Sequence, residues 1–294
     1  MPSLALLITT APAMVLSTTS RAVAHRVLQR CTDGGMFVER AFESVLSRHS
    51  LQGDDQARAT AIVHGVLRHR RSLDYYLGQL LDSSRVQQVP TTLALRIGAY
   101  ELLHTTTPAY LAVDSAVNLV KPPSQRRFVN GVLRALSNRR HTLLAPRDDP
   151  TLTPLRGLAI ATSTPDWLLR DLLSDGGGPL PSFAELERWA HATQRRPELA
   201  LRVNRLRTNR DDLTARLVSA GSVLSATPPP LPDTVLVTAA GREVSALPGF
   251  AEGAFTVQDV GAQCVALLAA PPMGGLTLDL CAAPGGKTCH VSGE

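Results

Sequence analysis

The part of the sequence best suited to chemistry lies near its end, where an apolar run leads into a loop of small residues. Residues 276–280 (Leu-Thr-Leu-Asp-Leu) predict a buried strand, and residues 281–286 carry two alanines, a proline and two glycines. A helix is expected to open at 287–290. These three elements make the first half of a βαβ unit, whose ligands sit at the carboxyl ends of the strands. The glycines and the helix start suit a ligand with a carboxylate or a phosphate.

Two kinds of ligand compete for this loop. The phosphate-binding pattern GxxxxGK[ST] is nearly met, because Gly286, Lys287 and Thr288 match it. However, Cys281 stands where the first glycine should be, and Pro284 removes one backbone donor from a phosphate cradle. The other candidate is the methionine end of S-adenosylmethionine.

The string at residues 278–288 is Leu-Asp-Leu-Cys-Ala-Ala-Pro-Gly-Gly-Lys-Thr. It resembles the cofactor motif of the RNA cytosine-5 methyltransferases in a nearly uninterrupted match. The resemblance implies S-adenosyl-L-methionine as the cofactor. It assigns the cofactor-binding role to Cys281, Ala282, Ala283, Pro284, Gly285, Gly286 and Lys287.

Basic residues are concentrated in the first half of the chain. Residues 1–150 hold 18 Lys and Arg against 11 Asp and Glu, a net charge of +7, whereas residues 151–294 hold 12 against 14, a net charge of −2. Only Lys121 and Lys287 are lysine. The excess positive charge of the first half indicates a polyanionic partner with a phosphate backbone.

The four cysteines form no CxxC pair, and their spacing predicts neither a metal site nor a disulfide framework. A reducing, cytoplasmic location is therefore expected. The apolar start of the chain, residues 1–19, lacks a basic n-region and is too short to span a membrane as a helix. We expect a disordered extension there, with Met14 as an alternative first residue, and no membrane association.

Residues 20–141 predict helices throughout, and their apolar stripes predict a compact all-α bundle. Ser20 is the expected first cap, and Pro90 and Pro108 are expected to open later helices. Both His64 and Tyr100 lie on apolar stripes and are expected in the core.

Three strings in this half resemble the NusB-like RNA-binding domain of small-subunit ribosomal RNA methyltransferases. They are Val-His-Gly-Val-Leu-Arg at 63–68, Leu-Arg-Ile-Gly-Ala-Tyr-Glu-Leu-Leu at 95–103 and Val-Asn-Gly-Val-Leu-Arg at 129–134. Their order, ahead of the cofactor motif, strengthens the resemblance. It implies 16S ribosomal RNA as the partner of a monomeric enzyme.

Arginines can pair with phosphates and stack on unpaired bases, so the arginine clusters are the candidate RNA contacts. A solvated surface remains the alternative for each cluster taken alone. The RNA-binding candidates are Arg68, Arg70, Arg71, Arg126, Arg127, Arg202 and Arg205. Arg202 lies within a predicted strand, Leu199–Asn204, and Arg205 directly follows it. The pattern of this strand and of the helix after it resembles the small subdomain that precedes the catalytic fold in the family.

We therefore expect a multidomain chain: an all-α NusB-like bundle, a small α+β subdomain and the start of an incomplete Rossmann-like α/β methyltransferase fold. The expected divisions are an extension (1–19), the bundle (20–141), a linker (142–165), the subdomain (166–252) and the start of the methyltransferase domain (253–294).

The resemblance implies methylation of a cytidine at carbon 5 by a cysteine nucleophile. In the family, the nucleophile and a second cysteine follow the cofactor loop, so the catalytic residues are expected downstream of Glu294. Neither Cys264, Cys281 nor Cys289 matches the catalytic motifs, and the chain alone is expected to be a truncated form without turnover. The alternatives are a non-enzymatic RNA-binding protein of the antitermination type and a nucleotide hydrolase.

Overall fold

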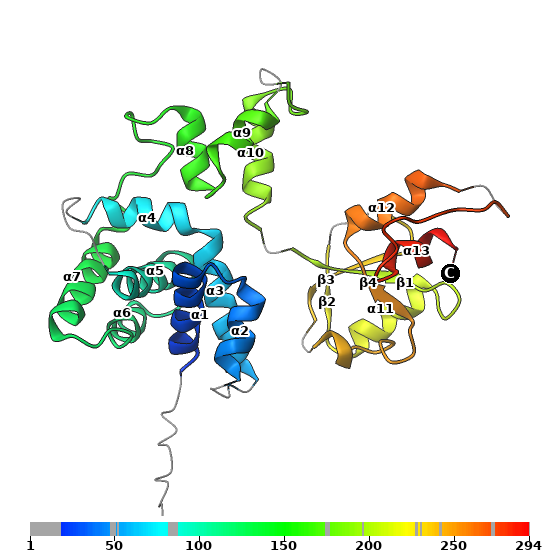
Figure 1. Ribbon diagram of the computed structural model, residues 1–294, viewed down its shortest axis with the longest axis horizontal. Coiled ribbons are helices and arrows are strands. Elements are labelled where there is room, and N and C mark those ends of the chain that lie inside the picture. The colour runs from blue at the N-terminus through cyan, green and yellow to red at the C-terminus, as the bar shows by residue number, and fades with distance from the viewer. Residues whose placement is uncertain are drawn as a thin grey trace, which may run out of the picture. The chain divides into compact units, whose positions relative to one another are not determined.

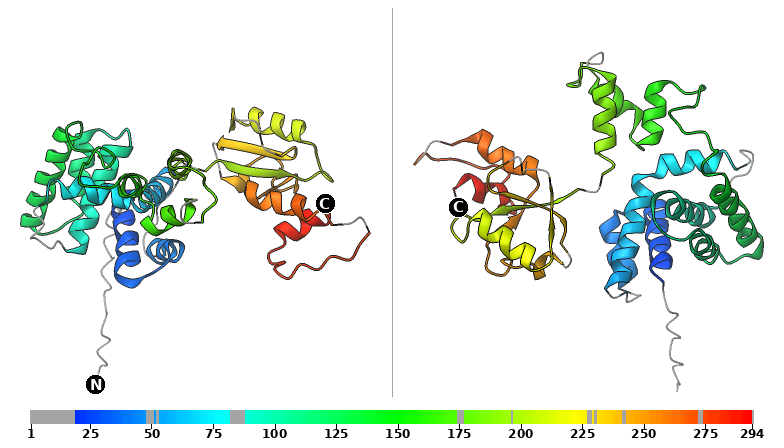
Figure 2. Two further views of the ribbon diagram at one scale, coloured as in Figure 1. Left: turned by 90° about the horizontal axis from the view of Figure 1, so that it is seen from above. Right: turned by 180° about the vertical axis from the view of Figure 1, so that it is seen from behind.

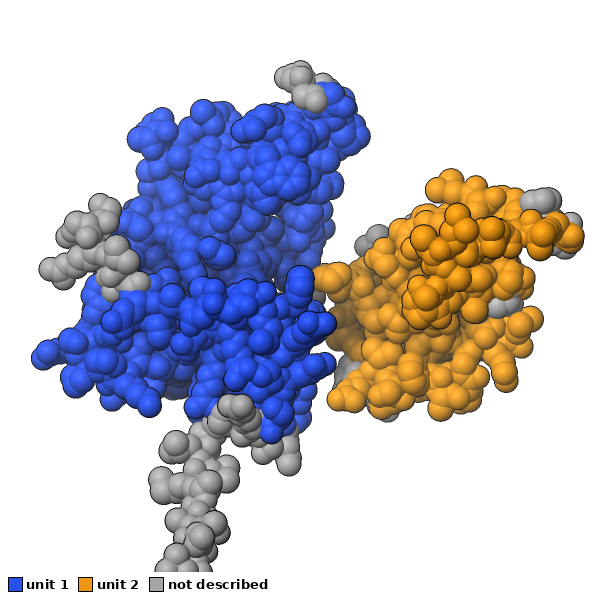
Figure 3. Space-filling view, in the orientation of Figure 1, with its two compact units in different colours: residues 1–195 blue, residues 196–294 orange. Residues whose placement is uncertain are grey.

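The computed structural model falls into two compact units, residues 1–195 and residues 196–294, which are described separately (Figures 1 and 3). No helix among the described residues is long and apolar enough to cross a membrane. The structure describes residues 19–47, 51, 53–81, 88–173, 177–195, 197–226, 229, 231–240, 243–271 and 274–293. The expected extension lies almost entirely outside them.

The described part of unit 1 is helical, as the apolar stripes predict. Prolines stand in the first turn of α5 and at the cap of α6, as expected. The first cap is Thr19 rather than Ser20, because the Thr19 side chain accepts the N–H of Ala22. The helices are α1 (Ser20–Gly34), α2 (Val38–Leu46), α3 (Asp54–Arg68), α4 (Arg70–Gly78), α5 (Val89–His104), α6 (Ala109–Val117), α7 (Pro123–Arg139), α8 (Pro154–Ala161), α9 (Asp166–Leu172) and α10 (Phe183–Ala192).

Helix α5 is the central element of the bundle. Its Leu93 and Ile97 pack into one apolar cluster with α1, α2 and α3, while its Leu95 and Leu102 pack into a second cluster with α4, α6 and α7. A helix that is covered on both sides buries apolar residues around most of its circumference, which explains why α5 lacks a polar face.

Two expectations about this unit are wrong. His64 is exposed on α3, where its neighbours Ile62 and Val63 fill the buried face instead. The expected linker at 142–165 contains helix α8, which packs with α9 and α10 around its own small apolar cluster. The prolines that suggested a linker include Pro154, which lies in the first turn of α8 behind the cap Thr153.

Unit 2 is built on one antiparallel sheet with the strand order β2-β3-β1-β4. Helix α11 covers one face of the sheet, and α12 and α13 cover the other (Figure 2). Asp259 caps α12 by accepting the N–H of Gly261, as expected. The elements are β1 (Leu199–Val203), α11 (Arg210–Ser219), β2 (Val223–Leu224), β3 (Thr234–Ala239), the 3-10 helix η2 (Val244–Ala246), β4 (Phe255–Val257), α12 (Val260–Ala269) and α13 (Gly286–Val291).

The sheet crosses the expected division between 252 and 253. Strand β4 pairs with β1 through Leu201 opposite Val257, so the segment expected to begin the next domain completes the sheet of the small one. The described residues therefore form a helical unit and an α+β unit, and they contain no Rossmann-like parallel sheet.

The expected strand at 276–280 is not formed. Leu276, Leu278 and Leu280 are 104%, 80% and 85% exposed, and these residues have no regular secondary structure. A strand needs the backbone N–H and C=O groups of a neighbour. Among the described residues, no strand lies beside this segment to supply them. The expected helix start is confirmed, since α13 begins at Gly286.

The packing at Gly65 yields a test of the bundle. A Cβ at Gly65 would lie 2.0 Å from Cζ of Tyr100, whereas a Cβ at Gly131, inside α7, would meet no atom within 4 Å. Alanine normally stabilises a helix interior by about 1 kcal/mol relative to glycine. Urea unfolding should therefore show that Gly131→Ala stabilises unit 1 by about this amount and that Gly65→Ala destabilises it. Equal effects of the two substitutions would contradict the close packing.

Candidate RNA-binding surface and cofactor loop

The loop between the exposed leucines of residues 276–280 and α13 forms a turn that side-chain hydrogen bonds close. The Asp279 carboxylate accepts the backbone N–H of Cys281 at 2.9 Å and the Thr288 hydroxyl at 2.6 Å. The same two hydrogen bonds lower the pKa of Asp279, and the one from Thr288 contributes most. The positive charge of Lys287 lowers this pKa further. Asp279 therefore stays ionised at neutral pH and ties the start of the turn to α13.

A chain of glutamines connects the turn to the sheet. Gln258 donates to the carbonyl of Gly286 at 3.2 Å, and Gln263 donates to the carbonyl of Gln258 at 2.9 Å. Thr234 on β3 donates its hydroxyl to Oε1 of Gln263 at 2.7 Å. Sequence reasoning missed Gln263, since a glutamine on an apolar helix gives no sign that it will reach a strand.

The residues predicted to bind the cofactor lie together on the surface. Gly285 has a left-handed backbone with φ of +109°, which glycine adopts without strain, and a Cβ on Gly286 would meet nothing within 4 Å. The backbone of the turn is therefore open to a ligand. The remaining predicted residues, all exposed, are Cys281, Ala282, Ala283, Pro284 and Lys287.

The predicted RNA-binding residues of unit 1 divide into surface and structural arginines. Arg70, Arg126 and Arg127 are exposed, and Arg68 is half-buried at the end of α3. The guanidinium of Arg126 donates to Oδ1 of Asn118 at 2.7 Å, which holds it at the surface. These four side chains can reach a phosphate without breaking the fold.

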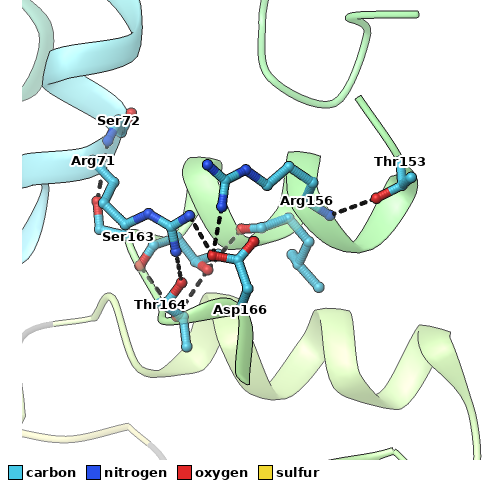
Figure 4. Close-up of polar contacts among 9 residues, drawn as sticks. Arg71, Ser72, Thr153, Arg156, Ser163, Thr164 and Asp166 are labelled. Carbon is cyan, nitrogen blue, oxygen red and sulfur yellow. Dashed lines mark hydrogen bonds and ion pairs between the residues drawn. The ribbon is translucent and has the colours of Figure 1, made fainter. Parts of the chain in front are cut away.

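Arg71 instead joins α4 to the start of α9 (Figure 4). Its guanidinium donates to the carbonyl of Thr164 and to Oδ2 of Asp166, the latter at 2.6 Å, and Arg156 donates to the same oxygen at 2.7 Å. Partial burial favours a higher pKa for Asp166, but the hydrogen bonds and charges of Arg156 and Arg71 outweigh it and lower the pKa. The ionised carboxylate thus holds both arginines, which gives Arg71 a structural role in unit 1, while its contact with RNA stays a prediction.

In unit 2 the two predicted arginines have different surroundings. Arg202 on β1 is only 2% exposed, because its strand is in the middle of a sheet covered on both faces. Burial lowers its pKa, against the opposing effects of Cys289 and Asp233. Arg202 is therefore buried in the described part of unit 2, and its expected place near the RNA channel stays a prediction. Arg205 remains 65% exposed while pairing with Asp233 at 2.5 Å.

An aromatic stack lies beside the surface arginines of unit 1. The rings of His69 and His104 are stacked with centroids 3.9 Å apart and an interplanar angle of 13°. Tyr100, one turn before His104 on α5, is inclined by 22° to the His104 ring at 5.8 Å. Sequence reasoning missed this group, although the spacing of Tyr100 and His104 places both on one helix face.

Two families match the chain. Residues 18–138 match the NusB family, and residues 164–242 match the ferredoxin-like domain of RsmF/B-like methyltransferases. The first match covers the bundle of α1–α7, and the second covers α9–α11 and β1–β3.

The ribosomal RNA small subunit methyltransferase B of Pasteurella multocida (strain Pm70) is 33% identical over 282 residues, which are 95% of this chain and 58% of that protein. The chain is a homologue of the ribosomal RNA small subunit methyltransferase B family. The probable member from Synechocystis sp. is 31% identical over 278 residues, 93% of this chain and 60% of its own length. The chain thus spans about three fifths of the length of these methyltransferases.

The crystal structure of PH0851 has a similar fold. The superposition covers 94% of this chain and 61% of the PH0851 chain, with a TM-score of 0.60 and 17% sequence identity. This likeness concerns the fold alone.

Arg70 and Arg71 are adjacent, so substituting each in turn compares a predicted surface contact for RNA with an arginine that stabilises the fold. Arg71→Ala removes two hydrogen bonds that connect α4 with the Thr164–Asp166 corner and should destabilise unit 1 by about 1–3 kcal/mol. Arg70→Ala should leave stability unchanged within about 0.5 kcal/mol but weaken RNA binding and reduce its salt dependence. Urea unfolding and a filter-binding salt series measure the two effects. The assignment fails if both variants lose stability equally.

His69 should make the protein sensitive to acid. Burial, with the charges of His104 and Arg68, lowers the pKa of His69 to about 4. Because the unfolded chain binds the proton more readily, the free energy of unfolding should fall between about pH 6.5 and pH 4 and then level off. Urea unfolding across this range should show a smaller loss for His69→Gln than for the wild type. The exposed His191 supplies the control substitution His191→Gln, which should keep the wild-type loss.

Proposed function

We propose that this chain supplies the RNA-binding and cofactor-binding parts of an enzyme that methylates carbon 5 of a cytidine in 16S ribosomal RNA. The observation that carries the proposal is the 33% identity to a ribosomal RNA small subunit methyltransferase B over 95% of the chain. The cytosine target and the cofactor rest on the resemblance of residues 278–288 to the motif of RNA cytosine-5 methyltransferases.

S-adenosyl-L-methionine, when bound, supplies a methyl group activated by its sulfonium. The role of this chain is to hold the amino-acid end of that molecule. The half-buried backbone at Gly286, where a Cβ would meet no atom within 4 Å, leaves room for it, and the hydrogen bonds that Asp279 accepts from Cys281 and Thr288 keep the turn in one shape. Pre-ordering the turn in this way reduces the conformational entropy that binding must cost.

Unit 1 would hold the RNA. Arg68, Arg70, Arg126 and Arg127 line its surface and can bind phosphates, with arginine able to form two parallel hydrogen bonds to one phosphate. The excess of basic residues in the first half of the chain would attract the RNA over a distance of about 8–10 Å at physiological salt.

We assign no covalent step to the four cysteines of this chain. Cys31 is half-buried, and burial together with Glu39 raises the pKa of its thiol, which disfavours the reactive thiolate. Cys281 is part of the turn, where its N–H is held by Asp279. The chain then contributes positioning, and the transfer of the methyl group is a property proposed for the whole enzyme.

A second candidate is RNA binding without catalysis. The match of residues 18–138 to the NusB family favours it, because that match does not depend on the cofactor loop. In this case the helical unit would bind RNA by the same surface arginines, and residues 278–288 would have no ligand.

Bisulfite sequencing of 16S ribosomal RNA tests the proposed reaction. In cells that lack the gene, one cytidine that is protected in the wild type should become convertible, because 5-methylcytosine resists bisulfite. Restoring the intact gene should restore protection, and a gene encoding Asp279→Ala should restore it less well, since the turn loses its two hydrogen bonds. An unchanged pattern of protected cytidines would contradict the proposal and favour the non-catalytic candidate.

A further inference from the structure

The aromatic stack of unit 1 is built at the meeting point of three helices. His69 is the single residue between α3 and α4, and His104 is the last residue of α5. Tyr100 packs on Gly65, so α3 and α5 approach closely and bring the two imidazoles face to face. The position of the rings is thus fixed by the core beneath them.

The outer end of the stack is open. His104 is exposed, while His69 is half-buried beneath it. Neither imidazole has a hydrogen-bonding partner among the described residues, so ring nitrogens remain able to bond to a ligand. Desolvation lowers the pKa of both rings, at His104 because its ring packs on His69 although the residue as a whole is exposed, and the neutral imidazoles can stack without repelling each other.

The charges around the stack are suited to a polyanion. Arg68 precedes His69 and Arg70 follows it. The carboxylate nearest to Tyr100 in sequence, Glu101, is only 3% exposed and is neutralised by Arg21, whose Nη2 lies 2.7 Å from its Oε1. Arg68 lies close enough to His69 for its charge to lower the pKa of that ring, so the inner ring of the stack has a positive neighbour.

We propose that the His69–His104 stack is a subsite for one unpaired base of RNA, which lies on the exposed face of His104 while its flanking phosphates contact Arg68 and Arg70. This inference rests on the proposed RNA binding of unit 1 and adds a specific position to it. Single-stranded RNA is recognised by aromatic side chains that continue the stacking of its bases, together with arginines that bind its backbone. A double helix, with its bases already stacked, has no free base face to offer.

The chemistry of the rings also determines what the subsite can select. Stacking on an aromatic face tolerates any base, so the subsite should prefer single strands over duplexes rather than one sequence over another. The open ring nitrogens can add a hydrogen bond to a base edge, but a phenyl ring at position 104 would keep the stacking surface without them. Comparing histidine with phenylalanine at position 104 therefore separates the contribution of stacking from that of hydrogen bonding.

The test uses the full 294-residue chain and a 12-nucleotide oligouridine that carries one 2-aminopurine, whose fluorescence is quenched when it stacks. The wild type and the control His191→Ala, which changes an exposed histidine of α10, should bind the oligonucleotide and quench the probe. His104→Ala should bind about 5- to 100-fold more weakly, with the quenching lost. His104→Phe should retain the quenching and should bind the oligonucleotide within about threefold of the wild-type affinity. Thermal melting of each variant confirms folding.

A second oligonucleotide, in which the 2-aminopurine is replaced by an abasic site, keeps every phosphate and removes one ring. His104→Ala should reduce the affinity difference between the two oligonucleotides. If the wild-type chain binds RNA with steep salt dependence but His104→Ala binds and quenches as the wild type does, the subsite is wrong and the RNA-binding proposal stands. If the chain binds no RNA at low salt, the proposed subsite and the proposed RNA binding of unit 1 are both wrong.

Discussion

The close contact of Tyr100 with Gly65 is the constraint on which the proposed RNA-binding surface of the helical unit depends. A side chain at residue 65 would occupy the position of the Tyr100 ring, so only glycine lets α3 and α5 approach so closely. The same Tyr100 ring lies beside His69, at the corner between α3 and α4, with the ring centroids 6.2 Å apart. Consequently, a packing requirement in the core determines which rings and arginines appear together at the surface.

Sequence patterns were sufficient for the helical elements and insufficient for single side chains. The apolar stripes located α1 to α7, and the cap of α12 at Asp259 followed from its residue type. By contrast, Arg202 was expected near an RNA channel from a family resemblance, and its neighbours in the sequence gave no sign that it would be buried. Its burial follows from the order of strands, which places β1 in the middle of the sheet, and strand order is a long-range property that local patterns do not contain.

The predicted cofactor loop shows the same contrast between local and long-range structure. Its turn is determined locally, by hydrogen bonds among Asp279, Cys281 and Thr288, which lie within ten residues of one another. The segment before it was expected to be a strand, but a strand depends on a neighbour, and the described residues place none beside Leu276–Leu280. A motif can therefore keep its local shape although the sheet that would bury its leucines is not formed around it.

Ion pairing with carboxylates determines which arginines would remain accessible for contact with RNA. Arg21 pairs with Glu101, Arg71 with Asp166, and Arg96 with Asp74, and their side chains are 11%, 26% and 15% exposed. An ion pair changes no formal charge, so the positive balance of residues 1–150 remains although carboxylates, one of them Asp166 in the second half, hold three of its arginines. Long-range attraction of RNA depends on net charge, but contact depends on the arginines that remain accessible. The affinity of this unit should therefore follow the few exposed guanidiniums near the rings rather than the total count.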